Sequence, residues 1–205
     1  MESNFKHYPY LLVVDLEATC DNREAKPCLV PKEQMETIEI GAVLVDSQTL
    51  ETVGELGIFV RPVRHPVLTE FCKQLTTITQ ADVDGAPLFP EAVASVERFL
   101  RDFQERVPRE SRGVAGRRVL FCSWGDYDKN QLALDAAHHG IVVPWAKHHC
   151  NVKKRFSEEL GLPKRFGMDG ALARIGLTLE GTHHRGIDDA RNIARLLPWI
   201  TGRRS

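Results

Sequence analysis

Runs and alternations of apolar residues predict four β-strands along the chain. Residues 10–18, YLLVVDLEA, form a short apolar run that ends in acids, which is typical of a buried strand with polar groups at its end. Residues 37–46, TIEIGAVLVD, are rich in β-branched side chains, and residues 52–62, TVGELGIFVRP, follow after a short turn, which indicates a meander. Residues 117–125, RRVLFCSWG, predict another buried strand, whereas residues 79–87, TQADVDGAP, are rich in turn formers.

Apolar residues with helical spacing occupy most of the remaining chain. Residues 89–107, FPEAVASVERFLRDFQERV, repeat apolar side chains every three or four positions. Residues 126–140, DYDKNQLALDAAHHG, predict a helix that ends at a glycine, and residues 167–177 predict a short helix. The last helix begins near Ile187. Strands followed by helices that alternate with strands predict a mixed sheet covered by helices, in one α/β domain.

Composition narrows the class of protein. A chain of 205 residues that is 42% hydrophobic can bury one substantial core. Its net charge of −1 argues against nucleic-acid binding by bulk charge, but it permits an enzyme that holds a few nucleotides in a local cleft. The basic, turn-rich tract at residues 101–118 is interpreted as a solvated loop rather than a binding patch.

Cysteine usage and the N-terminus indicate a cellular compartment. The five cysteines are odd in number, widely spread and without a Cys-x-x-Cys pair, which is typical of reduced thiols rather than a disulfide framework. The sequence MESNFKHYPY lacks the pattern of a signal peptide, and no apolar run approaches the roughly 20 residues that span a bilayer. We therefore expect a cytoplasmic protein that makes no use of a membrane.

Two acids stand at the end of the first predicted strand. Asp15 and Glu17 are separated by one residue, so on a strand their side chains point to the same side. Neighbouring carboxylates repel, and ionising both near a core is unfavourable unless a cation binds them. The alternative is a pair of solvent-facing acids, although the preceding apolar run, LLVV, is unusual for an exposed strand.

Two further pairs of acids lie where helices are expected to begin. A helix N-terminus favours acids through capping and the helix dipole, so one member of each pair can serve as a cap. We expect Asp126 and Asp188 to be these caps. Asp128 and Asp189 would then be free to turn inward.

A histidine accompanies the last pair of acids. His184 precedes Asp189 by five residues, a spacing that lets both approach one point, and its near-neutral pKa suits a general base. His183 is the alternative. Oxygen ligands of this kind select Mg²⁺ or Mn²⁺. Two such ions roughly 4 Å apart can stabilise the attacking and leaving oxygens of a phosphodiester, while the histidine takes a proton from the attacking water.

In these motifs the sequence resembles the DEDDh 3′→5′ exonucleases, the DnaQ-like branch of the ribonuclease H-like fold. VVDLEATC resembles the first motif, Asp-x-Glu, and SWGDYDKNQL the second, with Asp128 as its aspartate. HHRGIDDARN resembles the third, His-x4-Asp, which selects His184 and Asp189. The resemblance implies a mixed five-stranded sheet flanked by helices. It also implies two Mg²⁺ or Mn²⁺ ions held by Asp15, Glu17, Asp128 and Asp189.

A narrower resemblance is to the Eri-type ribonucleases and the bacterial KapD-like proteins. The segments that carry it are DLEATC, HPVLTEFCKQLTTITQADVD, NVKKRFSEELG and GTHHRGIDDARNIARLL. It implies one exonuclease domain over residues 8–200, with short tails at 1–7 and 201–205. The implied activity is a metal-dependent 3′→5′ exoribonuclease that releases nucleoside monophosphates from single-stranded 3′ ends. A DNA-directed exonuclease of the same fold and a catalytically silent nucleic-acid-binding module are the alternatives, and the intact set of acids and histidine favours an active enzyme.

The same resemblance implies substrate contacts at eight positions. They comprise two positions whose backbone meets the terminal sugar, where a 2′-OH can be sensed, and two residues that form a wall for the last base. Two aromatic residues could stack a base, although they could instead pack in the core. Two cations are candidates for contact with phosphate. In that order, these residues are Ala18 and Thr19, Leu75 and Thr76, Trp124 and Tyr127, and Lys129 and Arg185.

Overall fold

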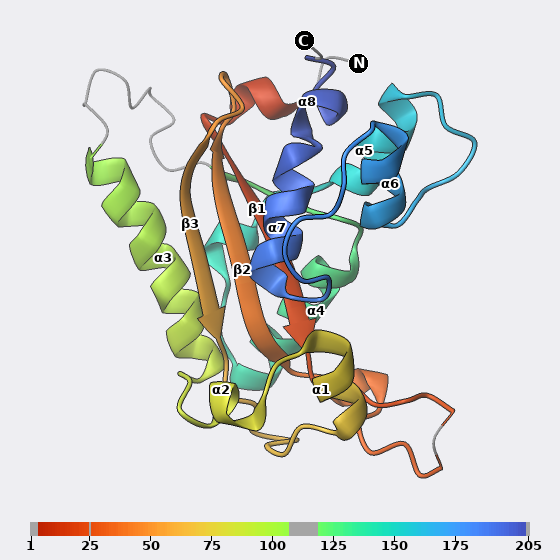
Figure 1. Ribbon diagram of the computed structural model, residues 1–205. Helices are drawn as coiled ribbons and strands as arrows, with labels where there is room; N and C mark the ends of the chain where they lie inside the picture. Colours follow the sequence, from red (N-terminus) through yellow and green to blue (C-terminus); the bar gives the residue numbers. More distant parts are fainter. Residues whose placement is uncertain (1–3, 25, 107–118, 204–205) are drawn as a thin grey trace.

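A mixed five-stranded sheet forms the centre of the computed structural model, which describes residues 4–24, 26–106 and 119–203 (Figure 1). The strands have the order β3-β2-β1-β4-β5. The first three pair antiparallel, β4 runs parallel to β1, and β5 runs parallel to β4. The strands are β1 (Tyr10–Ala18), β2 (Thr37–Asp46), β3 (Thr52–Phe59), β4 (Val119–Ser123) and β5 (His149–Asn151). The expected sheet is therefore confirmed.

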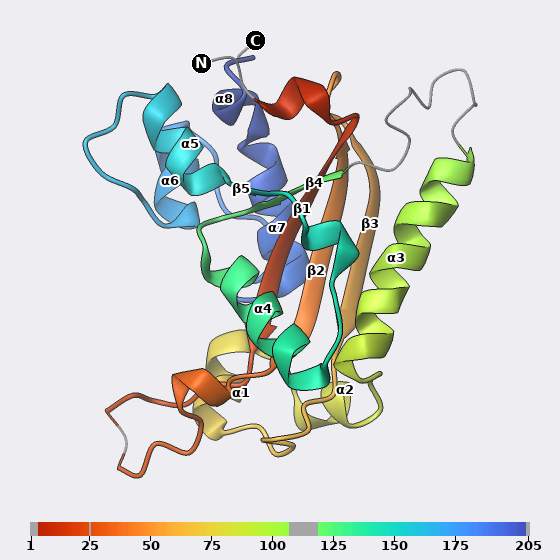
Figure 2. The same cartoon turned by 180° about the vertical axis from the view of Figure 1, so that it is seen from behind.

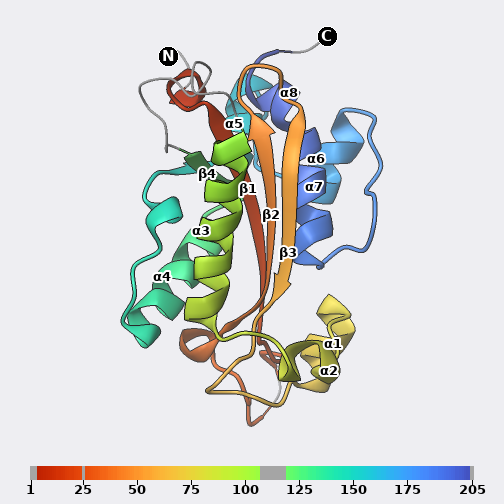
Figure 3. The same ribbon diagram turned by 90° about the vertical axis from the view of Figure 1, so that its left-hand side faces the viewer.

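Helices cover both faces of the sheet, as the edge-on view in Figure 3 shows. On one face lie α3 (Phe89–Arg106) and α4 (Tyr127–His139), which are in front in Figure 2. The other face carries α5 (Val152–Glu159), α6 (Met168–Arg174), α7 (Gly186–Arg195) and α8 (Leu197–Ile200). Two short helices, α1 (Glu70–Thr76) and α2 (Gln80–Asp84), lie at the end of the sheet where β1 finishes. Within the described ranges there are also the short 3-10 helices η1 (Asn4–His7), η2 (Lys32–Gln34) and η4 (Pro144–Ala146).

Strand β1 is buried on both faces, which explains its uninterrupted apolar run. Leu11 and Val13 pack in the core against α5–α7, whereas Leu12 and Val14 pack in the core against α3 and α4. Because side chains alternate along a strand, the odd-numbered positions continue toward the face of α7. The two acids of β1 therefore stand on the α7 side of the sheet.

Helix α7 approaches the sheet at two glycines. A Cβ atom added to Gly41 of β2 would lie 2.0 Å from the carbonyl carbon of Gly186, and one added to Gly186 would lie 3.0 Å from the carbonyl oxygen of Asp15. Only glycine permits this backbone-to-backbone contact, since atoms this close cannot coexist. The first turn of α7 is thereby held against the end of β1.

The predicted helices at 89–107, 126–140 and 167–177 correspond to α3, α4 and α6. The turn-rich stretch at 79–87 instead contains α2, because Thr79 and Asp82 form a reciprocal capping box. The tract at 101–118 is in α3 as far as residue 106, and the rest of it lies outside the described residues.

Two expected caps differ from the structure. Asp126 occupies the N-cap position of α4, but its carboxylate accepts a hydrogen bond from Asn151 Nδ2 (2.9 Å) rather than from the helix. The expectation for Asp188 is wrong, because α7 begins earlier, and Asp188 accepts a hydrogen bond from the Thr182 backbone N–H at 2.9 Å.

Phe5, within the expected N-terminal tail, is buried in the core. No helix in the described ranges combines the length and apolarity that crossing a membrane requires.

Candidate active site

A cavity of about 360 Å³ opens where β1 ends, between the starts of α4 and α7 and the helix α1. The four acids and the histidine singled out in the sequence all line it: Asp15, Glu17, Asp128, Asp189 and His184. They come from β1, α4, α7 and the loop before α7, so the fold brings together groups that are up to 174 positions apart in the sequence.

Three of the acids form a compact cluster of oxygen atoms. Asp15, Glu17 and Asp189 each offer one carboxylate oxygen, and these oxygens lie within 4.8 Å of one another. Asp15 and Glu17 share a face of β1, while Asp189 reaches them from the first turn of α7. The close contact between Gly41 and Gly186 makes this distance possible.

Asp128 enters the cavity from the first turn of α4. Its side chain is buried, and its Oδ1 accepts a hydrogen bond from the backbone N–H of Leu16 at 3.0 Å. This bond ties the start of α4 to β1 between the two other acids. Asp128 lines the same cavity but is not part of the cluster within 4.8 Å.

Burial makes all four carboxyl groups weaker acids than usual, and repulsion from neighbouring acids adds to the shift of Asp15, Glu17 and Asp128. Burial, followed by the charges of Asp128 and Glu17, raises the pKa of Asp15 well above its usual range. Burial, with Asp189 and Glu39 nearby, raises the pKa of Glu17 to about 9. Burial also raises the pKa of Asp128, to about 6, although the bond from Leu16 opposes the shift, and it raises the pKa of Asp189.

The donor set fits a divalent cation. It consists of hard carboxylate oxygens, which Mg²⁺ and Mn²⁺ prefer. A cation at this point would favour the ionised forms and remove the repulsion among them.

Two neighbouring histidines stand beside Asp189. His183 Nδ1 lies 3.0 Å from Asp189 Oδ2, and the backbone N–H of His184 donates to the same oxygen at 3.1 Å. The two rings stack with centroids 4.0 Å apart, and both line the cavity. His184 has a φ of 62°, a left-handed conformation that is uncommon outside glycine. Burial and the neighbouring His183 lower the pKa of His184.

Glu39 is a site residue that the sequence analysis missed. This carboxylate on β2 is 2% exposed and accepts hydrogen bonds from Arg185 Nε (3.1 Å) and the Gly186 backbone N–H (3.0 Å). It therefore fixes the start of α7. In the sequence, Glu39 stands out as an acid within the apolar strand TIEIGAVLVD, and this could have identified it. In the sheet it lies opposite Glu17.

Four of the eight expected substrate-contact residues line the cavity, namely Ala18, Leu75, Trp124 and Tyr127. The side chains of Leu75 and Tyr127 leave apolar surface open to solvent, with 38% and 43% of each residue exposed. Trp124 is partly buried and donates from Nε1 to the backbone oxygen of Phe166 at 3.1 Å. The cavity therefore has an apolar and aromatic wall beside its acids.

The other four residues do not line the cavity, for local reasons. The backbone N–H of Thr19 donates to the Glu36 carbonyl at 2.8 Å, and the buried Thr76 hydroxyl donates to the Cys72 carbonyl at 2.9 Å. Arg185 turns toward Glu39, and Lys129 is exposed on α4. The remaining lining residues, which carried no sequence signal, are Leu16, Cys20, Met35, Gly167, Met168 and Asp169.

Comparisons with known proteins point in one direction. A family model described as Exonuclease, RNase_T, matches residues 12–197. The chain is 33% identical over 200 residues to human ERI1 exoribonuclease 3, covering 97% of this chain and 55% of that protein. It is 31% identical over 202 residues to the 3′-5′ exonuclease eri1 of Schizosaccharomyces pombe, covering 92% of this chain and 66% of that protein. The chain thus spans about half the length of the mammalian relative.

Solved structures give the same result. The nuclease domain of 3′hExo, a DEDDh family member bound to rAMP, superposes with a TM-score of 0.80 at 28% identity, covering 96% of this chain and 92% of that one. A 3′-exonuclease described by its 3′-end-specific recognition of the histone mRNA stem-loop gives a TM-score of 0.80 at 27% identity, covering 93% and 80%.

Proposed function

The chain belongs to the RNase_T exonuclease family, and from that premise we propose that it is a metal-dependent 3′→5′ exoribonuclease. Its fold is the ribonuclease H-like fold of the solved relatives. The proposed reaction hydrolyses the last phosphodiester bond of a single-stranded RNA and releases a nucleoside monophosphate. The observation that carries the proposal is the cluster of Asp15, Glu17 and Asp189 oxygens within 4.8 Å, in a cavity that His184 also lines.

We propose that the four acids hold two divalent ions, Mg²⁺ or Mn²⁺. Bound there, such ions would supply Lewis-acid stabilisation to the attacking and leaving oxygens of the phosphodiester. Asp15, Glu17 and Asp189 would provide carboxylate oxygen ligands. Asp128 keeps its Oδ1 on the Leu16 N–H, so we assign only its other oxygen to metal binding.

His184 is the proposed general base. In its neutral form the imidazole can accept a proton from the attacking water, and the lowered pKa keeps it neutral near pH 7. Its left-handed backbone and the N–H bond to Asp189 direct this residue into the cavity that the acids line. His183 donates to or accepts from Asp189 directly, so we propose that it orients the acid.

The apolar wall is proposed to receive the terminal bases. Leu75 would pack against the last base, and Tyr127 and Trp124 would stack a base, since aromatic surfaces accept any base. Ala18 lines the cavity, whereas the Thr19 N–H is already bonded to Glu36, so we assign the contact with the ribose to Ala18. Lys129 and Arg185 remain candidates for phosphate contact.

The test uses RNA and DNA labelled at the 5′ end. With Mg²⁺ the RNA should shorten stepwise from its 3′ end, and Asp15→Asn should abolish the cleavage while the fold remains, because the change is nearly isosteric. Asp126→Asn is the matched control: this exposed acid lies outside the cavity and should retain activity.

Four results would contradict the proposal. Near-parental rates in Asp15→Asn would show that the site is misassigned, and cuts in a circular RNA would exclude an exonuclease. Faster cleavage of the DNA would favour a DNA-directed enzyme. A calorimetric titration that finds no Mn²⁺ binding would favour a silent binding module.

We also propose a cytoplasmic location. The five cysteines are free thiols in the structure, which fits a reducing compartment.

A further inference from the structure

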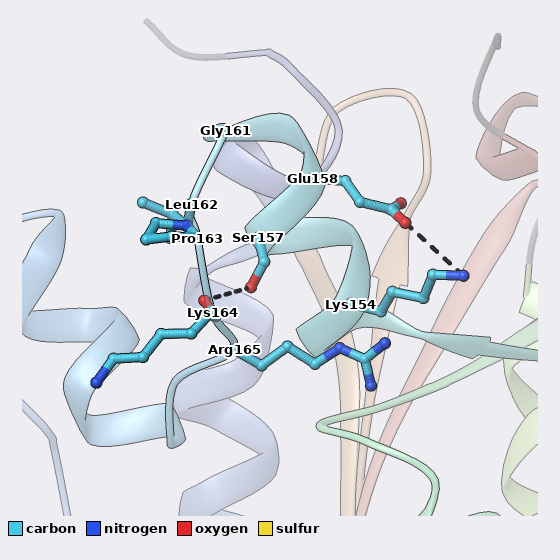
Figure 4. Close-up of a pocket in the computed structure, with 8 residues that line it drawn as sticks. All are labelled: Lys154, Ser157, Glu158, Gly161, Leu162, Pro163, Lys164 and Arg165. Atoms are coloured by element: carbon cyan, nitrogen blue, oxygen red, sulfur yellow. Dashed lines mark hydrogen bonds and ion pairs between the residues drawn. The ribbon is translucent and has the colours of Figure 1, made fainter.

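Three exposed cations lie in or beside the loop between α5 and α6. Lys164 and Arg165 lie in this loop, and Arg174 ends α6; we call these three residues the basic surface. The loop borders a second hollow of about 370 Å³ (Figure 4). In that view Lys164 and Arg165 leave the loop in opposite directions, and Arg165 extends toward α5.

Positive charge is concentrated in this part of the chain. Residues 152–174 contain six lysines and arginines but three acids, although the whole chain has a net charge of −1. Lys154 and Arg155 are paired with acids of α5. By contrast, among the described residues no carboxylate lies within 4.0 Å of a charged nitrogen of the basic surface. Its charge is therefore available to an anionic partner.

The basic surface is physically connected to the active-site cavity. Lys164 Nζ and Arg174 Cζ lie 5.4 Å and 4.1 Å from the centroid of the Phe166 ring. The carbonyl oxygen of Phe166 accepts a hydrogen bond from Trp124, which lines the cavity. The next residue, Gly167, lines the cavity itself. Phe166 thus links Lys164 and Arg174 to the wall of the cavity.

The chain path limits how far the basic surface lies from the cavity. Lys164 precedes Gly167 by three residues, so their Cα atoms are at most about 11 Å apart. A stacked nucleic-acid strand advances about 3.4 Å per nucleotide. A separation of up to about 11 Å corresponds to up to about three nucleotides beyond those in the cavity, so the lysine would meet the backbone no more than about five nucleotides from the 3′ end.

We propose that the basic surface binds phosphates of the substrate strand upstream of the nucleotides in the cavity, no more than about five nucleotides from the 3′ end. This inference rests on the proposed function, because it takes the cavity to be the place where the 3′ end binds. Such contacts carry no sequence preference and hold the strand in position. They also explain how a chain without bulk positive charge retains an RNA: the charge is local.

The test compares Lys164→Ala/Arg165→Ala/Arg174→Ala with a matched control, Arg98→Ala/Arg101→Ala/Lys147→Ala. The control also removes three exposed cations, two of them from α3 on the other face of the sheet. Binding of a fluorescent ten-nucleotide oligouridylate is measured in EDTA over a range of salt concentrations. Hydrolysis of the same RNA and of a three-nucleotide RNA is measured with Mg²⁺.

The expected effect follows from counterion release. Each phosphate contact with a single strand contributes about 0.7 to the slope of log affinity against log salt, so losing three contacts should lower the slope by about 2. At about 0.1 M salt this is roughly a 10–100-fold weaker affinity for the ten-nucleotide RNA. The rate on the three-nucleotide RNA and the saturated rate on the longer RNA should not change, and the control should match the parent.

The single variant Arg165→Ala tests the proposal even if the triple variant folds poorly. The Arg165 side chain makes no hydrogen bond or ion pair with the described residues, so removing it should leave the fold intact. The variant should lower the slope by about 0.7. An unchanged slope and affinity in the triple variant, with hydrolysis intact, would overturn the inference and leave the proposed function standing. An equal loss in the control would overturn it too. A parent protein that hydrolyses neither RNA would instead refute the proposed function.

Discussion

Replacing Glu17 by glutamine should stabilise the metal-free protein while removing its activity. Glu17 is 8% exposed and faces Asp189, Glu39 and Asp128, and its pKa of about 9 means that it keeps a proton at neutral pH. The unfolded chain would release that proton, since the ordinary pKa is 4.5. The folded state therefore binds more protons, and its stability decreases as the pH rises from about 4.5 to about 9. A glutamine does not titrate, and its amide can donate to the neighbouring acids.

The magnitude follows from the size of the shift. Between pH 4.5 and about pH 7.5 the unfolded state gains about 1.36 kcal/mol for each pH unit, which amounts to about 4 kcal/mol. Water in the open cleft reduces this value, so we expect Glu17→Gln to be at least about 2 kcal/mol more stable than the parent at about pH 7.5 in EDTA. For a chain of this size, about 2 kcal/mol raises the Tm by roughly 4–8 °C.

Thermal unfolding in EDTA at about pH 5 and about pH 8, followed by circular dichroism, measures the effect. The advantage of the variant should be small at the lower pH and large at the higher one. Added Mg²⁺ should raise the Tm of the parent more than that of the variant, because it binds the ionised carboxylates. A variant that melts below the parent in EDTA at about pH 8, or a difference independent of pH, would refute the reasoning.

The remaining predictions concern the base, the helix contact and the sugar. His184→Ala should lower the rate about 10²–10⁴-fold and His183→Ala much less, as single-turnover assays would show; the opposite ranking would make His183 the base. Because the pKa of His184 is lowered, the parent's pH–rate profile should fall only below about pH 6.5, and a fall beginning above that value would contradict the assignment. In urea unfolding, Gly41→Ala should lower the stability of the protein by at least about 3 kcal/mol. The control Gly57→Ala should change the stability little, because its Cβ would lie 3.4 Å from Ile187. Equal effects of the two substitutions would contradict the inferred backbone contact between Gly41 and Gly186. A single 2′-deoxynucleotide at the 3′ end should slow cleavage roughly tenfold, because a polar group then loses its partner, and equal rates would remove the ribose contact.

Local patterns in the sequence predicted the parts of the fold that depend on neighbouring residues. The run LLVV followed by Asp15 and Glu17 predicted a buried strand whose acids share one face, because alternation is a local property. Helix α4 ends where Gly140 adopts a φ of 62°. Strand β5, by contrast, has three residues and pairs with β4 through the fold, so no periodicity could identify it.

Contacts between distant segments could not be predicted in the same way. Glu39 bonds to Arg185 and Gly186, which are 146 and 147 residues away, and this pairing exists only after α7 packs on β2. The same pairing turns Arg185 away from the cavity. Thr19 has its backbone N–H bonded to Glu36, a bond that depends on the course of the loop between β1 and β2. The spacing of motifs indicated which residues gather, and the packing determined which groups remain free.

The cavity is lined partly by residues on tightly packed segments and partly by residues at exposed helix positions, and this difference has an evolutionary consequence. Asp15 and Asp189 stand on segments held together by backbone contact, where almost any change of volume disturbs the chemistry. Leu75 and Tyr127 project instead from solvent-exposed positions of helices, where substitutions disturb little packing. Under the proposed function, descendants of such a chain can therefore exchange the residues proposed to face the bases, and so drift toward new substrates, while inheriting the proposed hydrolytic centre unchanged.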